Sequence, residues 1–253
     1  MITFSLQSGS NGNAIYVEAG DVHLLFDAGI SGRQAALRMA EHERNIRDVD
    51  ALILSHDHSD HARCAGIYQR KFGLPIYATR KTLAAIWCDL GKLTDVRHFR
   101  SGDTLEFGPV RVHTVPTPHD GSDPVVFVVE FERKRLGIFT DLGHPFATLP
   151  RLLQSVHAAY LESNYDPHLL ETGPYPPALQ ARIRGAGGHL SNDEAAELLR
   201  RCGRRRPKWL ALAHLSEQNN HPDLALQTHH RVVGRRYPFT VAGRYGVSEL
   251  LRV

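Results

Sequence analysis

Short runs of β-branched and aromatic residues recur along the chain, and most end at glycine, proline or a polar residue. The first two, residues 14–18 and 23–26, are separated by Gly20-Asp21, which predicts a β-hairpin. Later apolar runs predict strands at residues 49–54, 75–78, 110–115, 125–131, 136–140, 158–161 and 209–213. The pattern therefore indicates a protein rich in strands.

Segments between these runs carry apolar residues at helical spacing. They predict helices at residues 33–44, 59–72, 79–90, 149–156, 191–202 and 222–236. Ser191 is the expected N-cap of one helix, because the acids Asp193 and Glu194 fall in the first turn after it. A further short helix, bracketed by residues 174–177 and 185–188, is expected to be an exposed excursion. The alternation favours an α/β fold, and no repeat or low-complexity block divides it, so we expect one domain over residues 1–253.

The composition, 42% hydrophobic and 23% charged, excludes a disordered chain. A net charge of +3 is too small to argue by itself for a nucleic-acid partner. Three widely separated cysteines argue against a disulfide framework. Because the sequence shows no signal-peptide pattern and no long apolar run, we expect a cytoplasmic protein without a membrane partner. The 16 histidines are unusual and prompt a search for metal ligands.

Four candidate metal ligands fall within six residues, directly after the strand predicted at residues 49–54. These ligands are His56, His58, Asp60 and His61. In open α/β folds, functional sites lie at the carboxyl ends of strands. A loop at that position can aim two imidazoles at one point and the next two side chains at a second point, so the spacing suits two neighbouring cations. Three more candidates also follow predicted strands: His119, Asp141 and His214.

This series resembles the signature of the metallo-β-lactamase superfamily, H-x-H-x-D-H followed by a lone histidine, a lone aspartate and a final histidine. The resemblance implies an αββα sandwich that binds two divalent metal ions. The ligands would be His56, His58 and His119 for one ion and Asp60, His61 and His214 for the other, with Asp141 between them. Asp27, at the end of another predicted strand, would support these ligands without binding a metal. Zn²⁺ suits this mixed nitrogen and oxygen set best, and ligand type also allows Mn²⁺ or Fe.

Residues around the site must indicate the substrate, because this fold hosts many reactions. Residues 188–191 precede His214 in a pairing that resembles the RNase Z group of nucleases. That resemblance implies that His189 stabilises the transition state or protonates the leaving oxygen; the alternative is that His189 only caps a helix. Arginines are expected on helices that flank the mouth of the site, at positions 182, 184, 204–206 and 235–236.

A Gly/Ser/Asn loop at residues 8–13 is a second candidate for substrate binding. It would present consecutive N–H groups and polar side chains to a phosphate, or else be a plain flexible turn. Its candidate binding residues are Ser8, Ser10, Asn11 and Asn13.

Four segments together resemble the YycJ (WalJ) family of bacterial metallo-β-lactamase-fold proteins, over essentially the whole chain. They are residues 8–13, 161–166, 188–192 and 214–220. The resemblance implies a 5′→3′ exonuclease on DNA with a link to repair, and it adds Asn164 to the substrate-binding candidates. His221 departs from the expected Tyr-like residue and has no assigned role. Only 48 positions separate Asp141 from His189, too few for an inserted β-CASP domain.

The mechanism expected from these residues is phosphodiester hydrolysis by a hydroxide that bridges the two metals, oriented by Asp60, with His189 sharing the developing charge. DNA is favoured over RNA as the partner, and the oligomeric state is left open. The alternatives are an RNA-processing nuclease, a thioesterase of the glyoxalase II type and a non-enzymatic regulatory protein. The complete ligand set argues against the last, because buried unpaired histidines and aspartates are costly without a metal.

Overall fold

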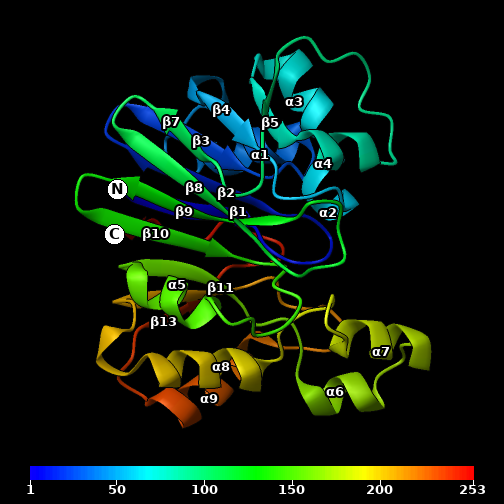
Figure 1. Ribbon diagram of the computed structural model, residues 1–253, viewed down its shortest axis with the longest axis vertical. Helices are drawn as coiled ribbons and strands as arrows, with labels where there is room; N and C mark the ends of the chain where they lie inside the picture. Colours follow the sequence, from blue (N-terminus) through cyan, green and yellow to red (C-terminus); the bar gives the residue numbers. More distant parts are fainter.

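Apolar side chains on both faces of the strands build two sheets that pack against each other in the computed structural model, which describes residues 1–253 (Figure 1). In β2 (Ala14–Ala19), Ile15 and Val17 point into the layer between the sheets, where Phe127 of the second sheet meets them. Tyr16 packs on the opposite face, in the core beneath the helices. Helices cover both outer faces, so the αββα sandwich expected from the sequence is confirmed.

The first sheet has the strand order β14-β1-β2-β3-β4-β5-β6. Its strands other than β2 are β1 (Ile2–Gln7), β3 (Val22–Phe26), β4 (Ala51–Ile53), β5 (Ile76–Thr79), β6 (Val96–Phe99) and β14 (Leu251–Arg252). The helices of this half are α1 (Gly32–Ala40), η1 (Ile46–Asp48), α2 (Ser59–Ala62), α3 (Ala65–Phe72) and α4 (Arg80–Ala85). Strands β3 to β6 run parallel, so their carboxyl ends share one edge.

The second sheet has the order β13-β12-β11-β10-β9-β8-β7. Its strands are β7 (Thr104–Phe107), β8 (Val110–Pro116), β9 (Val125–Phe131), β10 (Lys134–Phe139), β11 (Ala158–Glu162), β12 (Trp209–Ala213) and β13 (Phe239–Val241). Its helices are α5 (Leu149–Ser155), α6 (Pro167–Thr172), α7 (Pro177–Arg184), α8 (Asn192–Cys202), η2 (Gly203–Arg205) and α9 (Pro222–Val233). Strands β10 to β13 are parallel and also end together.

Every strand predicted from the residue pattern is present, with small differences at the ends. Five further strands were not predicted: β1, β6, β7, β13 and β14. The helix predicted at 59–72 is divided into α2 and α3, because the Cys64 N–H leaves the helical pattern and donates to the Ala28 carbonyl at 3.0 Å. The helix predicted at 33–44 stops at Ala40, and Glu43 adopts a left-handed φ of 58°.

Helix starts follow local capping chemistry. Ser191 caps α8 as predicted: its Oγ accepts the Glu194 N–H at 3.2 Å, and the Glu194 side chain accepts the Ser191 N–H at 2.9 Å. His221, left without a role by the sequence, is the N-cap of α9, where its Nδ1 accepts the Asp223 N–H. The longest helix, α9, has 12 residues, and no helix is long and apolar enough to cross a membrane.

Candidate metal centre

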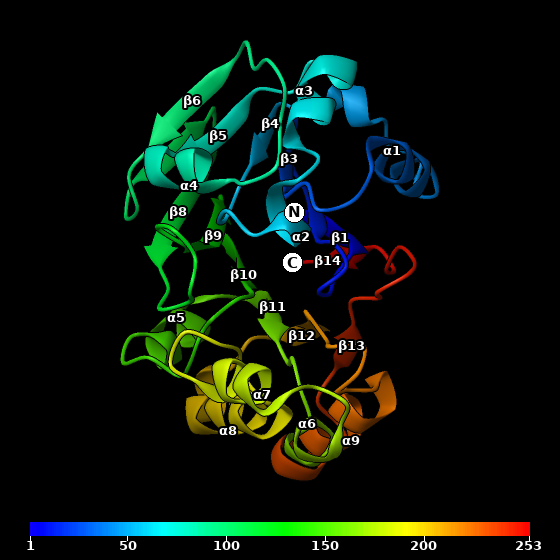
Figure 2. The ribbon, with the colours of Figure 1, turned by 90° about the vertical axis from the view of Figure 1, so that its right-hand side faces the viewer.

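The predicted ligands meet at the edge of the sandwich where parallel strands of both sheets end (Figure 2). Asp27 follows β3, Asp141 lies beyond β10, and His214 follows β12. All three residues have left-handed backbones, with φ of 66°, 56° and 55°. This conformation costs a non-glycine residue about 1–3 kcal/mol and persists mainly at functional sites. The backbone is therefore strained where it turns these side chains inward.

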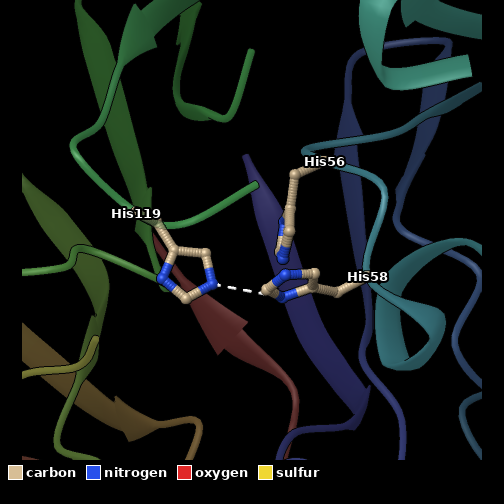
Figure 3. A group of neighbouring side chains, drawn as sticks. All are labelled: His56, His58 and His119. Atoms are coloured by element: carbon tan, nitrogen blue, oxygen red, sulfur yellow. Dashed lines mark hydrogen bonds between the residues drawn. The ribbon is translucent and has the colours of Figure 1, made fainter. Parts of the chain in front are cut away.

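The first ligand group consists of three imidazoles. His56 and His58 come from the loop after β4, and His119 comes from the loop after β8; the three rings converge in Figure 3. Their ligand nitrogens lie within 4.8 Å of one another. The Nδ1–H of His119 donates to the Gly188 carbonyl at 2.9 Å, which leaves its Nε2 free to bind a cation. His56 Nε2 is buried and has no hydrogen-bond partner.

The second ligand group consists of Asp60, His61 and His214. Its ligand atoms also lie within 4.8 Å of one another. Asp60 Oδ2 lies 3.3 Å from His214 Nε2 and 3.5 Å from His61 Nε2. Behind this group, Asp27 Oδ2 is 2.7 Å from His61 Nδ1, and Asp27 Oδ1 accepts the Ser55 N–H at 2.8 Å. Asp27 thus holds the His61 ring with Nε2 facing the centre, which is the supporting position predicted for it.

Asp141 lies between the two groups. Its Oδ2 is 3.1 Å from His61 Nε2, and its Oδ1 is 3.6 Å from His119 Nε2. The carboxylate is buried, and Oδ2 has no hydrogen-bond partner. Buried polar atoms are normally satisfied, so the orphaned oxygen of Asp141 and the orphaned nitrogen of His56 fit a bound cation. The donor set of imidazoles and carboxylates is one that divalent metal ions prefer.

The electrostatics of the centre also favour cations. Burial opposes a charge on His214, yet Asp141, Asp60 and Glu162 outweigh it and raise the pKa of His214 to about 10. Burial likewise opposes ionisation of Asp141, but His214 and His61 hold the pKa of that carboxyl well below its usual range. Several ionised carboxylates therefore share a site shielded from water, where positive charge is strongly stabilised.

Glu162, the last residue of β11, was not predicted as a site residue. It is fully buried, and its Oε1 lies 2.7 Å from His189 Nδ1 and 3.3 Å from His214 Nδ1. Its Oε2 accepts the Leu142 N–H at 2.9 Å. Burial raises its pKa, but the interactions with His189 and His214 outweigh burial and bring the pKa to about 2. The sequence signal was weak: Glu162 ends a buried strand, as the predicted ligands follow theirs, but a single acid at a strand end is common.

The structure divides the predicted substrate-binding residues into two sets. Ser8, Asn13 and Asn164 are buried behind the ligands. Ser8 Oγ accepts the His214 N–H at 2.8 Å, Asn13 Nδ2 donates to Asp60 Oδ2 at 3.2 Å, and Asn164 Nδ2 donates to the His214 carbonyl at 2.7 Å. These contacts position the ligands.

Ser10 and Asn11 form the outer set, on the solvent side of the same loop. Asn11 Oδ1 accepts from Arg244 Nη1 at 3.2 Å, and the Asn11 carbonyl accepts from Arg63 Nη2 at 2.6 Å. Only this part of the loop combines accessible polar groups with neighbouring cations.

The prediction that arginines lie on helices flanking the mouth of the site is partly wrong. Arg182 does lie at the site, where its Nε donates to Asp120 at 2.6 Å; Asp120 Oδ1 is in turn 3.5 Å from His58 Nε2. The arginines at 204–206 precede β12, and those at 235–236 precede β13, which is parallel to it. Since the centre lies at the carboxyl ends of these strands, both clusters are at the opposite end of the sheet.

This fold and site define a metallo-hydrolase of the metallo-β-lactamase superfamily, whose family model matches residues 8–214. Within it, the chain belongs to the YycJ/WalJ family. It is 35% identical over 222 residues to the exodeoxyribonuclease YycJ of Bacillus anthracis, a match that covers 87% of this chain and 84% of that protein. It is also 35% identical over 227 residues to the exodeoxyribonuclease WalJ of Streptococcus pneumoniae, with 88% and 84% covered. The resemblance seen in the sequence is confirmed.

Solved structures show the same architecture at lower identity. The metallo-β-lactamase fold protein YhfI of Bacillus subtilis matches with a TM-score of 0.72 and 18% identity, over 98% of both chains. The short form of human tRNase Z matches with a TM-score of 0.67 and 15% identity, over 100% of both chains. At these identities the comparisons establish the fold.

Proposed function

We propose that the protein is a metal-dependent phosphodiesterase that removes nucleotides from DNA in the 5′→3′ direction. The observation that carries the proposal is His189, an additional imidazole whose Nδ1 lies 3.7 Å from Asp141 Oδ1, beside both ligand groups. A thioesterase with the same metals has no use for a further imidazole, whereas a phosphodiesterase must stabilise charge on phosphoryl oxygens. The relatives at 35% identity are exodeoxyribonucleases, which supports DNA as the substrate.

Two divalent ions fit the seven ligands. His56, His58 and His119 would hold one, and Asp60, His61 and His214 would hold the other, with Asp141 shared. When bound, such ions supply Lewis acidity toward the phosphate and make water nucleophilic near neutral pH. Zn²⁺ is the ion we favour from the ligand types, with Mn²⁺ and Fe as alternatives.

Asp60 is proposed to orient the attacking water. Burial raises its pKa, but His61 and His214 outweigh burial and keep the pKa well below the usual range, so the carboxylate is ionised at neutral pH. The side-chain amide of Asn13 fixes one oxygen of Asp60. The carboxylate therefore accepts a hydrogen bond from water without being free to rotate away.

His189 is proposed to act on the leaving oxygen. Its Nδ1 is committed to Glu162 at 2.7 Å, which leaves Nε2 as the atom that faces a substrate. About a fifth of the His189 side chain is exposed, so substrate reaches it, while Glu162 is fully buried. The pair can place a proton on the departing oxygen or share the negative charge that develops there.

The direction of digestion is proposed to come from the outer part of the 8–13 loop. Asn11, which follows the exposed Ser10, accepts hydrogen bonds from Arg63 and Arg244, and the loop's inner residues contact Asp60 and His214. A terminal 5′-phosphate bound there would set the distance from the strand end to the ligands. Cations and hydroxyls are suitable partners for a phosphate monoester.

The test is hydrolysis of bis(p-nitrophenyl) phosphate in Zn²⁺ and in Mn²⁺. Asp60→Ala and Asp141→Ala are expected to lower kcat by at least about a thousandfold. Asp193→Ala serves as the control, because this exposed carboxylate pairs with Arg231 on the surface. Wild-type turnover in either site variant, or cleavage of a thioester without cleavage of the phosphodiester, would contradict the proposal.

A further inference from the structure

A hollow lined by basic side chains lies on the same edge of the sandwich as the metal centre. Arg80, Lys81, His98 and Arg100 are all exposed around it, and its volume is about 600 Å³. It lies where β5 and β6 end, and these strands run parallel to β4, which leads into the His56 loop. Figure 2 views the molecule from this side, with β5, β6 and α4 at the upper left and α2 near the centre. We call this hollow the basic groove.

The wall of the basic groove continues into the metal centre. Thr82 Oγ1 donates to the Ser122 carbonyl at 2.9 Å, and the Ser122 N–H donates to Asp57 Oδ1 at 2.6 Å, within the ligand loop. Asp123 lines the groove, and Gly121, two residues earlier, packs so closely that an added Cβ would lie 3.2 Å from His56. The groove and the metal ligands are therefore neighbours, separated only by the short segment that runs from His119 to Asp123.

The charges of the groove are available to a ligand. Arg97 and Arg111 elsewhere on the surface pair with carboxylates, whereas Arg80, Lys81 and Arg100 form no ion pair. Two acids also line the groove: Asp103, whose Oδ2 accepts the Arg100 backbone N–H at 2.8 Å, and Asp123. The cations Arg80, Lys81 and Arg100 outnumber them.

The basic groove also contains a hydroxyl group that has no hydrogen-bond partner. The Oγ of Ser101, another lining residue, is buried without a hydrogen-bond partner. The exposed, unpaired cations Arg80, Lys81 and Arg100 are the groups that a nucleic-acid backbone contacts.

We infer that the basic groove binds the phosphodiester backbone of the substrate strand beyond the nucleotide being removed. This inference rests on the proposed function. Cations that contact successive phosphates add affinity that depends on strand length and on salt, without contributing to the chemical step. The groove therefore distinguishes a polymeric substrate from a small phosphodiester.

The test compares two triple variants that each remove three positive charges. The groove variant, Arg80→Ala/Lys81→Ala/Arg100→Ala, removes the arginines and the lysine that line the basic groove. The control variant, Arg204→Ala/Arg235→Ala/Arg236→Ala, removes exposed cations at the opposite end of the second sheet. The groove variant is expected to raise KM for a single strand of about 20 nucleotides by about tenfold or more and to flatten the salt dependence of kcat/KM. Turnover of bis(p-nitrophenyl) phosphate is expected to stay within about twofold of wild type in both variants.

A binding measurement separates this inference from the proposed function. Fluorescence anisotropy of the same labelled strand reports affinity without cleavage when it is carried out on Asp60→Ala protein alone, with the groove substitutions and with the control substitutions. Weaker binding in the groove variant alone supports the inference. Equal KM and equal affinity in the two triple variants would overturn it even if wild type digests DNA, while intact DNA with wild type would overturn the proposed function.

Discussion

Glu162 contacts two imidazoles of the centre through one oxygen and has no exposed surface. We expect Glu162→Gln, which keeps the shape and removes the charge, to lower kcat on bis(p-nitrophenyl) phosphate by about 10–100-fold. The shorter contact is with His189, at 2.7 Å against 3.3 Å for the ligand His214, so we expect kcat to fall by more than the content of bound metal. Steady-state kinetics together with metal analysis of the purified variant make this measurement.

Glu197→Gln is the matched control, since Glu197 pairs with Arg200 and Arg201 on the surface of α8. It should leave kcat unchanged. A positioning role for Glu162 is refuted if kcat is unaffected in Glu162→Gln, or if kcat falls only in proportion to lost metal.

His229 gives a prediction for stability that is independent of the metal centre. It is buried in α9, its Nδ1–H donates to the Ala225 carbonyl at 2.9 Å, and burial lowers its pKa to about 4. Between pH 6.5 and pH 4 the unfolded chain binds a proton that the native state does not, so stability falls as pH falls. Between pH 7 and pH 5, the free energy of unfolding of His229→Gln should therefore fall by about 2 kcal/mol less than that of wild type.

Urea unfolding at the two pH values measures this difference. Exposed His168 is the control position, and His168→Gln should keep the wild-type pH dependence. The same loss of stability in His229→Gln and in wild type would show that His229 is not the group responsible.

At the scale of elements, the loop after β3 packs directly against the backbone of α2, where the Ala28 N–H donates to the His61 carbonyl at 2.6 Å. A Cβ added at Gly29 would lie 1.6 Å from the Asp60 carbonyl oxygen, so only glycine fits. Gly29→Ala should displace Asp60 and lower both activity and bound metal by at least about tenfold, with a destabilisation of about 1–3 kcal/mol.

Gly246→Ala is the control for this prediction, because no atom lies within 4 Å of the added Cβ. Activity, metal content and thermal unfolding of the two variants provide the comparison. Full activity in Gly29→Ala would show that the position of α2 does not depend on this contact.

Elements also show what the sequence could predict. Each predicted ligand follows a strand recognisable from its buried apolar run, so the strand-end location of the centre was predictable. Strands β6 and β7 were missed because about half of their side chains are exposed and neighbouring strands define them. The arginines at 204–206 were misplaced although the sequence holds the signal: they precede the strand that His214 follows, so they lie at its amino end. Glu162 was missed because one acid after an apolar run resembles an ordinary strand end.

At the scale of the whole molecule, each ligand group draws on both sheets. In the first group, His56 and His58 come from the first sheet and His119 comes from the second. In the second group, Asp60 and His61 come from the first sheet and His214 comes from the second. The proposed metal ions would therefore link the two halves of the sandwich, and their free energy of binding would add to stability.

Metal removal with a chelator should lower Tm by about 10 °C, and Zn²⁺ should restore it. Asp141→Ala, which removes the carboxylate between the two groups, should show a smaller metal-dependent change in Tm. Calorimetry of the metal-loaded and metal-free proteins tests this, and identical Tm values for wild type in both states would contradict a metal held between the sheets.

Digestion of an end-labelled DNA strand tests the central claim most directly. Strands labelled at either end, with a 5′-phosphate or a 5′-hydroxyl, would be incubated with the protein in Zn²⁺ and in Mn²⁺, beside Asp60→Ala. We expect stepwise loss of nucleotides from the 5′ end, faster on the 5′-phosphorylated strand and absent in Asp60→Ala. Loss from the 3′ end would contradict the proposed direction, and intact DNA beside a cleaved RNA or thioester would contradict the proposed substrate.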